Sequence, residues 1–286
     1  MARRNKPHGD PLPDFVRELR HISLDNPRDA VVRYNLGVAY GELGKSEEAI
    51  AAYRSAIEID PAYAAPYFNL GCTLLESGLP QEAKSEFEQM IKLAPTEAEG
   101  FFMLGTVYGI LGMPEQLIQA TKAGLQIAPD SPQACLNIGL ASNRLGQFKQ
   151  AVDFLTRVIT LDGDNPAAHL QLAHAHRGLG NTKEEIQACR QAIAIQGDFI
   201  DAWFHLGAAY LKKVRGPDAQ VDYIETNGNF DLNDPMQLFY FSLGLLAMGM
   251  KDEAKEHLPK IRKALPAAAQ ELESCLALEN NGVRGE

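Results

Sequence analysis

The sequence is short of cysteine, of positive charge and of long apolar runs, and each shortage excludes a class of protein. Its four cysteines lie far apart with no CxxC pair, which argues against a disulfide framework or a zinc ribbon and indicates reduced thiols. Lys and Arg number 27 against 37 Asp and Glu, a formal net charge of −10, so the cation surplus that nucleic-acid binding needs is missing. The apolar share of 45% is nevertheless too high for a disordered chain.

No segment has the pattern of an export signal or of a membrane span. The basic start of the chain is followed by Pro7, Pro11 and Pro13 instead of an apolar core. The longest uncharged run, Pro235 to Met250, is shorter than the roughly 20 residues that cross a bilayer. We therefore expect a cytoplasmic protein with no membrane span and no nucleic-acid partner.

Glycine recurs along the chain with a fixed period of 34 residues. The first series is Gly44, Gly78, Gly112, Gly146 and Gly180. A second series follows a Leu or Ile each time and has an alanine in one slot: Gly37, Gly71, Gly105, Gly139, Ala173 and Gly207. Because prolines share the same spacing, at Pro61, Pro95 and Pro129, the pattern indicates an internal repeat.

Each repeat predicts two amphipathic helices, because its apolar residues are spaced three and four apart in two runs. The glycine between the runs supplies the left-handed backbone that ends the first helix. Ser131-Pro132 and Asn165-Pro166 have the pattern of an N-cap followed by a proline at the first helical position.

These features resemble the tetratricopeptide repeat family, most clearly in YNLGVAYGELGKSEEAIAAYRSAIEIDP (34–61) and AWFHLGAAY (202–210). The resemblance implies an all-α fold, an α-solenoid in the form of a right-handed superhelix, with about seven stacked helix-turn-helix units, an N-terminal helix and a C-terminal capping helix. The expected segments are a mobile stretch 1–12, a helix in 13–29, an array over 30–266 with repeats at 30–63, 64–97, 98–131, 132–165, 166–199, 200–234 and 235–266, a capping helix 267–279 and a tail 280–286.

The last two repeats depart from the pattern. Val214 stands where a turn glycine belongs, and the second half of 200–234 is degenerate, so we expect a short helix and a loop there. The shortened repeat 235–266 opens with a helix that is apolar on nearly every face. Such a helix is either buried on several sides or presents an adhesive face, and we favour burial beneath the capping helix.

The resemblance also implies a concave groove, lined by the first helix of each repeat, that binds a linear peptide or helix of a partner protein. Its apolar side chains would anchor the segment, and its amides would bond to the segment's backbone. The residues expected to line it are Tyr34, Asn35, Val38, Phe68, Asn69, Phe102, Met103, Leu136, Asn137, Leu140, Leu170, Gln171, His174, Phe204 and His205.

Charge changes sign along this expected groove. The early repeats place Glu42, Glu76 and Glu99 there, and the later repeats place Arg144, Arg177 and Lys212, with Asp201 as the exception. The pattern predicts a bound segment whose basic end lies over the first three repeats and whose acidic end lies over repeats four to six.

The chain has no GxSxG, HExxH or P-loop spacing, so we expect a non-enzymatic scaffold with no catalytic residue, cofactor or metal. One alternative is a structural scaffold that self-associates through the apolar seventh repeat and the ends of the array. A weaker one is a metal-dependent activity at His174 and His205, which adjacent repeats should bring together. Two histidines without a third ligand make a poor zinc site, and a pH-sensitive contact with a partner's carboxylate is the better interpretation. Residues 1–12 could also fold back into the groove as a tethered competitor.

Overall fold

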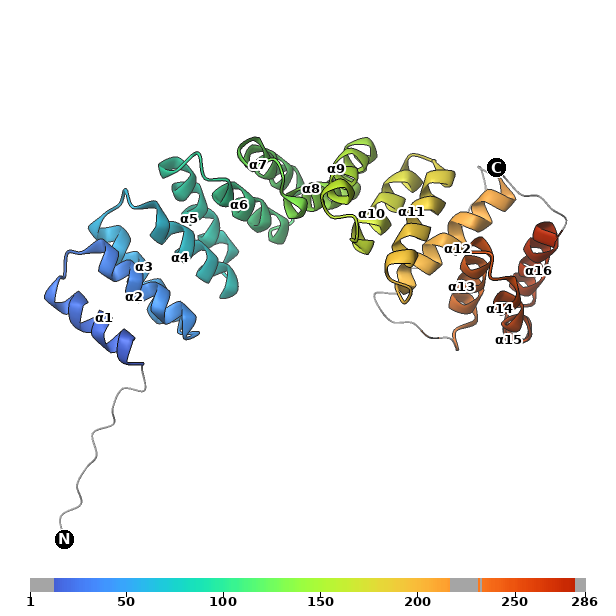
Figure 1. The fold of residues 1–286 in the computed structure, drawn as a ribbon, viewed down its shortest axis with the longest axis horizontal. Helices are drawn as coiled ribbons and strands as arrows, with labels where there is room; N and C mark the ends of the chain where they lie inside the picture. The colour runs from blue at the N-terminus through green and yellow to red at the C-terminus, as the bar shows by residue number, and fades with distance from the viewer. Residues whose placement is uncertain (1–12, 217–230, 232, 281–286) are drawn as a thin grey trace, which may run out of the picture. The chain divides into compact units, whose positions relative to one another are not determined.

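A computed structural model describes residues 13–216, 231 and 233–280, and the regular elements in these ranges are all α-helices (Figure 1). The expected all-α solenoid of stacked helical hairpins is thereby confirmed. The stretch 1–12, the second helix expected in the sixth repeat (217–230) and the tail 281–286 lie outside the described residues. The chain forms two compact units, Met1–Pro129 and Asp130–Glu286.

Unit 1, Met1–Pro129, is a row of antiparallel hairpins that follows a single N-terminal helix. Within each hairpin the first helix has 13 residues and the second has 14. Each second helix also packs against the first helix of the next hairpin, so the stack buries a continuous core. Its helices are α1 (Asp14–Asp25), α2 (Ala30–Glu42), α3 (Ser46–Ile59), α4 (Ala64–Glu76), α5 (Pro80–Leu93), α6 (Ala98–Ile110) and α7 (Pro114–Ile127).

The turn glycines end the first helices in the predicted way. Gly44 has a φ of 69°, and the N–H of the next residue, Lys45, donates to the carbonyl of Tyr40 at 2.9 Å. This bond spans the last turn of the helix and is the signature of a Schellman motif. The same arrangement recurs at the other four turn glycines of the 34-residue series, each with a φ between 69° and 76°.

Polar caps start several helices. The side chain of Asn165 accepts a hydrogen bond from the N–H of Ala168 at 2.9 Å, and that of Ser131 accepts from Ala134 at 3.3 Å, each ahead of a proline at the first helical position. Both predicted N-caps are confirmed.

Unit 2, Asp130–Glu286, repeats the hairpin pattern and then departs from it. Without a turn glycine at Val214, helix α12 runs on through Arg215, and it ends only at Gly216, whose φ of 106° favours glycine. The helices of this unit are α8 (Pro132–Arg144), α9 (Phe148–Leu161), α10 (Pro166–Gly178), α11 (Thr182–Ile195), α12 (Ile200–Arg215), α13 (Pro235–Ala247), α14 (Lys251–Glu256), α15 (Leu258–Ala264) and α16 (Pro266–Asn280).

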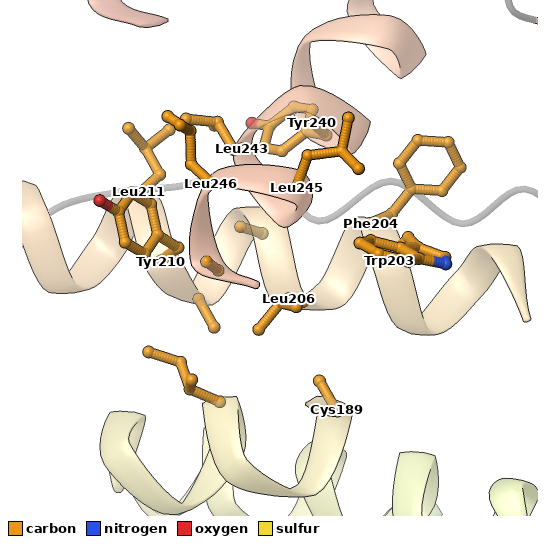
Figure 2. Packing of buried hydrophobic residues seen from close by; sticks show 14 of the residues in the cluster. Cys189, Trp203, Phe204, Leu206, Tyr210, Leu211, Tyr240, Leu243, Leu245 and Leu246 are labelled. Atoms are coloured by element: carbon orange, nitrogen blue, oxygen red, sulfur yellow. The ribbon is translucent and has the colours of Figure 1, made fainter. Parts of the chain in front are cut away.

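Helix α13 is the apolar helix of the seventh repeat, and the structure buries it. It packs against α12 on one side and against α14, α15 and α16 on the others. Tyr240, Leu243 and Leu246 of α13 are at most 5% exposed and face the side chains of α12, as Figure 2 shows. Burial beneath the capping helix is therefore the correct interpretation, and the apolar face that suggested self-association through this repeat is covered.

The second helix of the seventh repeat is broken into α14 and α15. Pro259 lies in the first turn of α15 and has no N–H to continue the hydrogen-bond ladder, so the chain bends at His257. Helix α16 then packs on α13 and α15 at the place of the expected cap. None of the helices within the described ranges is long and apolar enough to cross a membrane.

Candidate functional site

The first helices of unit 1 carry a row of partly exposed apolar side chains. Phe68 on α4 and Phe102 on α6 are half-buried, and Phe68 meets the ring of Phe87 edge-on with the centroids 5.9 Å apart. On α2, Tyr34 is also half-buried and lies 5.3 Å from the ring of Tyr63. The expected groove residues Val38 and Met103 are likewise half-buried.

The corresponding side chains of unit 2 are more deeply placed. Leu136, Leu140 and His174 are half-buried, but Leu170, Phe204 and His205 are 6%, 1% and 4% exposed. Leu170 and Phe204 belong to the large apolar cluster that α12 forms with α11 and α13. The expectation that these three residues line an open surface is therefore corrected, because neighbouring helices cover them.

The amides expected to form a ladder bond mainly to the protein itself. Asn69 donates from Nδ2 to the hydroxyl oxygen of Tyr34 at 3.0 Å, which links α4 to α2 of the preceding repeat. Asn137 accepts at Oδ1 from Gln133, 3.0 Å away on the same helix. Asn35 is exposed. Asn69 thus serves to align two repeats, a role that its sequence position did not reveal.

The charged residues of the expected groove differ between the units. Glu42, Glu76 and Glu99 of unit 1 are all exposed. In unit 2, Arg144 is exposed, whereas Arg177 and Lys212 are half-buried. Of the charged residues expected to line the groove, those of unit 1 are thus exposed carboxylates, whereas those of unit 2 are cations, two of them half-buried.

A hollow of about 290 Å³ lies in unit 2 beside α8 and α10. It combines two guanidinium groups, two amides and an imidazole with apolar walls. Its lining residues are Leu140, Asn143, Arg144, Phe148, Gln171, His174, Arg177 and Gly178.

Two amides fix one wall of this hollow. The Nδ2 of Asn143 donates to the backbone carbonyl of Gln171 at 2.9 Å and to its side-chain Oε1 at 3.2 Å. Because the Oε1 of Gln171 accepts this bond, its NH₂ group remains a donor. Asn143 and Gln171 are twenty-eight residues apart, so they join adjacent repeats in the same way as Tyr34 and Asn69 do in unit 1.

Two histidines and an arginine form a hydrogen-bonded chain at the hollow, where His174 and Arg177 belong to the lining and His205 does not. The Nε2 atoms of His174 and His205 lie 3.0 Å apart, and Nη1 of Arg177 lies 3.3 Å from Nδ1 of His205. A guanidinium can only donate, so Nδ1 of His205 accepts, and the proton of this imidazole is on Nε2. His205 therefore donates to Nε2 of His174, whose own proton is on Nδ1.

This chain requires both imidazoles to be neutral. Burial lowers the pKa of His174 to about 4, assisted by Arg177 and opposed by Asp201. Burial lowers the pKa of His205 to about 3, assisted by His174 and Arg177. The prediction that adjacent repeats bring His174 and His205 together is confirmed.

The same geometry does not favour a metal site. Each Nε2 atom is occupied by the other imidazole, and the next polar group, Arg177, is a cation that would repel a metal ion. Within the described ranges, no group of three or more His, Cys, Asp or Glu side chains could hold a metal ion.

Two residues whose side chains could in principle act as nucleophiles, Ser242 and Cys72, have structural roles instead. Ser242, on α13, donates from Oγ to the carbonyl of Leu238 at 2.7 Å and lies 2.9 Å from Nδ1 of His257. Its hydroxyl proton is thus used by the backbone and the residue is fully buried, so His257 does not act as its base. Burial and Glu76 raise the pKa of the half-buried Cys72 to about 11, which keeps this thiol protonated.

The repeats match known families of proteins. Residues 64–97, 132–165 and 166–199 match the tetratricopeptide repeat model, and residues 42–78 match a second model described as TPR repeat. The first three intervals coincide with the second, fourth and fifth expected repeats. The chain is a tetratricopeptide repeat protein.

Several solved structures share this tetratricopeptide repeat fold. They include YrrB, described as a TPR protein with an unusual peptide-binding site (22% identity, 65% of this chain and 96% of that chain, TM-score 0.61). A MamA protein is 20% identical over 68% of this chain and 98% of that chain, with a TM-score of 0.57. PilF of Pseudomonas aeruginosa is 18% identical over 87% of this chain and 98% of that chain, with a TM-score of 0.52.

At these identities the similarity establishes the fold alone. No curated protein matches the chain in sequence. Stacked helical repeats use their extended surfaces to bind other proteins, so the fold supports a general role in protein–protein interaction.

Proposed function

We propose that the chain is a non-enzymatic adaptor that binds a linear segment of a partner protein along the first helices of unit 1. The observation that carries the proposal is the row of half-buried apolar side chains on α2, α4 and α6, among them Tyr34, Phe68 and Phe102. Half-buried aromatic rings are held rigidly on one side and offer apolar area on the other, which is how binding anchors are built.

The chemistry of the partner follows from the charges beside this row. Glu42, Glu76 and Glu99 are exposed at intervals along the same first helices. A segment that alternates apolar residues with Lys or Arg would match both features, and opposite charges would speed its association. Asn35, an exposed amide, is available to the segment's backbone, whereas Asn69 is engaged by Tyr34.

Charge reversal tests this proposal without disturbing the core. A fluorescein-labelled peptide of alternating Leu and Lys residues is titrated with the full chain, and its anisotropy is measured at about 50 mM salt, where charge effects are weakly screened. The variant Glu42→Lys/Glu76→Lys/Glu99→Lys should weaken binding about tenfold or more. A peptide with Glu in place of Lys should bind poorly to the natural chain.

The matched control is Glu47→Lys/Glu58→Lys/Glu115→Lys, which makes the same change in net charge at exposed positions on the second helices α3 and α7. This control should retain nearly the full affinity. Equal weakening by the two triple variants would refute the proposal, because the peptide would then sense only net charge. Absence of binding up to about 1 mM peptide would refute it as well.

A further inference from the structure

Helix α1 has the register of a second helix of a hairpin. Adding the 34-residue period to Asp14–Asp25 gives 48–59, which lies within α3, the second helix of the first hairpin. Like α3 and α5, α1 packs against the first helix that follows it, which is α2. It lies at the end of the row of unit 1, as Figure 1 shows, and no first helix precedes it within the described residues.

In the complete hairpins, the second helix buries the side that faces its own first helix. On α3 this side carries Ala49, Tyr53 and Ala56, which are 0%, 3% and 0% exposed. A Cβ atom on Gly37 of α2 would lie 2.5 Å from the ring of Tyr53, so a first helix covers this side closely. The residues at the same positions of α5 are at most 7% exposed: Ala83, Phe87 and Met90.

On α1 the same side is uncovered. One period before Ala49, Tyr53 and Ala56, it carries Phe15, Leu19 and Ile22. Phe15 is 46% exposed, Ile22 is 37% exposed and Leu19 is half-buried. Because these residues are four and three positions apart, they form one apolar stripe along the helix.

The hairpins of this chain show which kind of element covers such a stripe. In each of them a helix does so, and it places a small residue, such as Gly37, against the largest side chain of the second helix. An amphipathic helix with apolar residues at intervals of three and four matches the stripe of α1 in the same way. Its small residue would face Phe15, which stands where α3 has Ala49.

Carboxylates beside the stripe select the charge of that helix. Glu18 follows Phe15 by three residues and precedes Ile22 by four, and Asp25 follows Ile22 by three. Both carboxylates are exposed and neighbour the stripe on the helix surface. A helix with Lys or Arg along the edge of its apolar side would therefore be complementary.

Other segments of this chain do not match these features. In a symmetric antiparallel pair of α1 helices, Phe15 would meet Ile22 of the other copy and the two Glu18 carboxylates would face each other, which is unfavourable. Helix α16, the last helix of the array, contains no Lys or Arg. Residues 1–12 include Pro7 and Pro11, which interrupt a helical stripe.

We infer that the stripe of α1 is a docking surface for a basic amphipathic helix of a partner protein, which completes the half-hairpin at this end of unit 1. The apolar side of the partner helix would cover Phe15, Leu19 and Ile22, and its cations would meet Glu18 and Asp25. This surface lies on α1 and does not rest on the peptide-binding face proposed for α2, α4 and α6.

Helical peptides provide the test, with the full chain and anisotropy at about 150 mM salt, which screens long-range attraction. Three labelled 18-residue peptides are compared: one with Leu and a central Ala in a single helical stripe and Lys elsewhere, one with the same residues in scrambled order, and one with the stripe but Glu in place of Lys. The striped Lys peptide should bind about tenfold more tightly than the other two and should gain helical circular dichroism.

Variants then assign the binding to α1. Phe15→Asp/Ile22→Asp should weaken the striped Lys peptide about tenfold or more, because it places charge in the stripe and leaves the side facing α2 unchanged. Unaltered hydrogen exchange in α2 and α3 would verify the fold. The matched control Leu93→Asp/Ile127→Asp makes the same change at the last residues of α5 and α7, each 40% exposed, and should have little effect.

A charge change tests the surface without altering its apolar contacts. Glu18→Lys should weaken the striped Lys peptide about threefold, whereas Glu47→Lys, at an exposed position of α3, should not. The groove variant Glu42→Lys/Glu76→Lys/Glu99→Lys should weaken it less than Phe15→Asp/Ile22→Asp does, which separates the two proposals.

Four results would overturn the inference. The first is equal binding of the striped and scrambled peptides, including the case in which neither binds up to about 1 mM. The second is equal weakening by the two Asp pairs. The third is stronger weakening by the groove variant, which would place the peptide on the first helices. The fourth is a dimer in sedimentation that Phe15→Asp/Ile22→Asp abolishes, which would make a second copy the occupant.

Discussion

The two units of the chain share one repeat but use different chemistry to join neighbouring repeats. In unit 1 the junction beside the first helices is aromatic, and the hydroxyl oxygen of Tyr34 accepts a hydrogen bond from the side-chain amide of Asn69. In unit 2 the corresponding junctions are one amide pair, Asn143 and Gln171, and one imidazole pair, the half-buried His174 and the buried His205. The comparison teaches that one backbone pattern tolerates an aromatic junction as well as a junction of imidazoles that burial keeps neutral.

Helices α12 and α13 of unit 2 also approach each other more closely than helices α2 and α3 of unit 1 do. At the eighth position of the first repeat, a Cβ atom on Gly37 would lie 2.5 Å from the ring of Tyr53, which is a side chain. At the same position of the sixth repeat, a Cβ atom on Gly207 would lie 2.0 Å from the backbone oxygen of Tyr240. Helices α12 and α13 of unit 2 are thus in backbone contact, and a ring can move aside more easily than a helix can.

The largest effect is expected from replacing these glycines. Gly207→Ala should lower the free energy of unfolding by about 3 kcal/mol or more, because α12 and α13 must separate, whereas Gly37→Ala should cost about 1 kcal/mol. Urea unfolding followed by Trp203 fluorescence reports on unit 2, and hydrogen exchange of α2 and α3 reports on unit 1.

Gly197→Ala is the control for this pair, since nothing lies within 4 Å of the added Cβ atom and its effect should be small. If Gly37→Ala destabilised the chain as much as Gly207→Ala, the distinction between ring contact and backbone contact would be wrong.

Acid should destabilise unit 2 more than unit 1, and the expected loss of stability is similar in size to that of Gly207→Ala. The pKa of His174 is about 4 in the folded chain and about 6.5 when unfolded, so the unfolded state binds more protons between these values. The stability of unit 2 is therefore fully present above pH 6.5 and falls by about 3 kcal/mol from this group as the pH approaches 4. Urea unfolding monitored by Trp203 at a series of pH values measures the slope.

The double variant His174→Gln/His205→Gln should reduce this dependence, whatever its effect on stability at pH 7. Burial also lowers the pKa of His169, His176 and His257 of unit 2, so part of the dependence should remain. The matched control is His21→Gln, at an exposed position on α1 of unit 1, which should leave the slope unchanged. An unaltered slope in the double variant would show that the imidazole pair does not govern the acid sensitivity of unit 2.

The smallest effect is expected at the aromatic junction of unit 1. Tyr34→Phe removes the oxygen that accepts from Asn69 and should cost about 1 kcal/mol, seen as faster hydrogen exchange in α2 and α4 but not in unit 2. The control Tyr67→Phe removes a hydroxyl that donates to the carbonyl of Pro61 in an exposed setting, and it should cost less. Equal effects would mean that the bond between repeats adds nothing beyond an ordinary surface hydrogen bond.

Much of the fold follows from local rules that can be recognised directly in the sequence. A glycine every 34 residues requires a left-handed turn at that place, and Gly44 and its four counterparts adopt it. Ser131 and Asn165, each followed by proline, begin helices because their side chains satisfy backbone N–H groups close by in the chain. The missing glycine at Val214 has a local consequence too, since α12 continues to Arg215.

The candidate sites follow from the sequence less completely. The repeat register indicates that Tyr34, Asn69 and His205 lie on first helices, but not which of them remain available. Asn69 is engaged by Tyr34 and His205 is buried, because the neighbouring repeat supplies a partner or a cover. The pair of Ser242 and His257 carried no signal in the sequence, since it depends on the bend that Pro259 makes possible.

The sequence by itself thus determined the repeat, the helix ends and the change of charge along the first helices, because these depend on each residue's own backbone preference and on a fixed period. Only the tertiary structure decided which apolar side chains stay half-exposed, which amides are engaged, and which tautomer His205 adopts beside Arg177. Those outcomes depend on atoms brought together from different repeats. The period of the sequence specifies which helices are neighbours, but it does not specify which side chains between them form hydrogen bonds with each other.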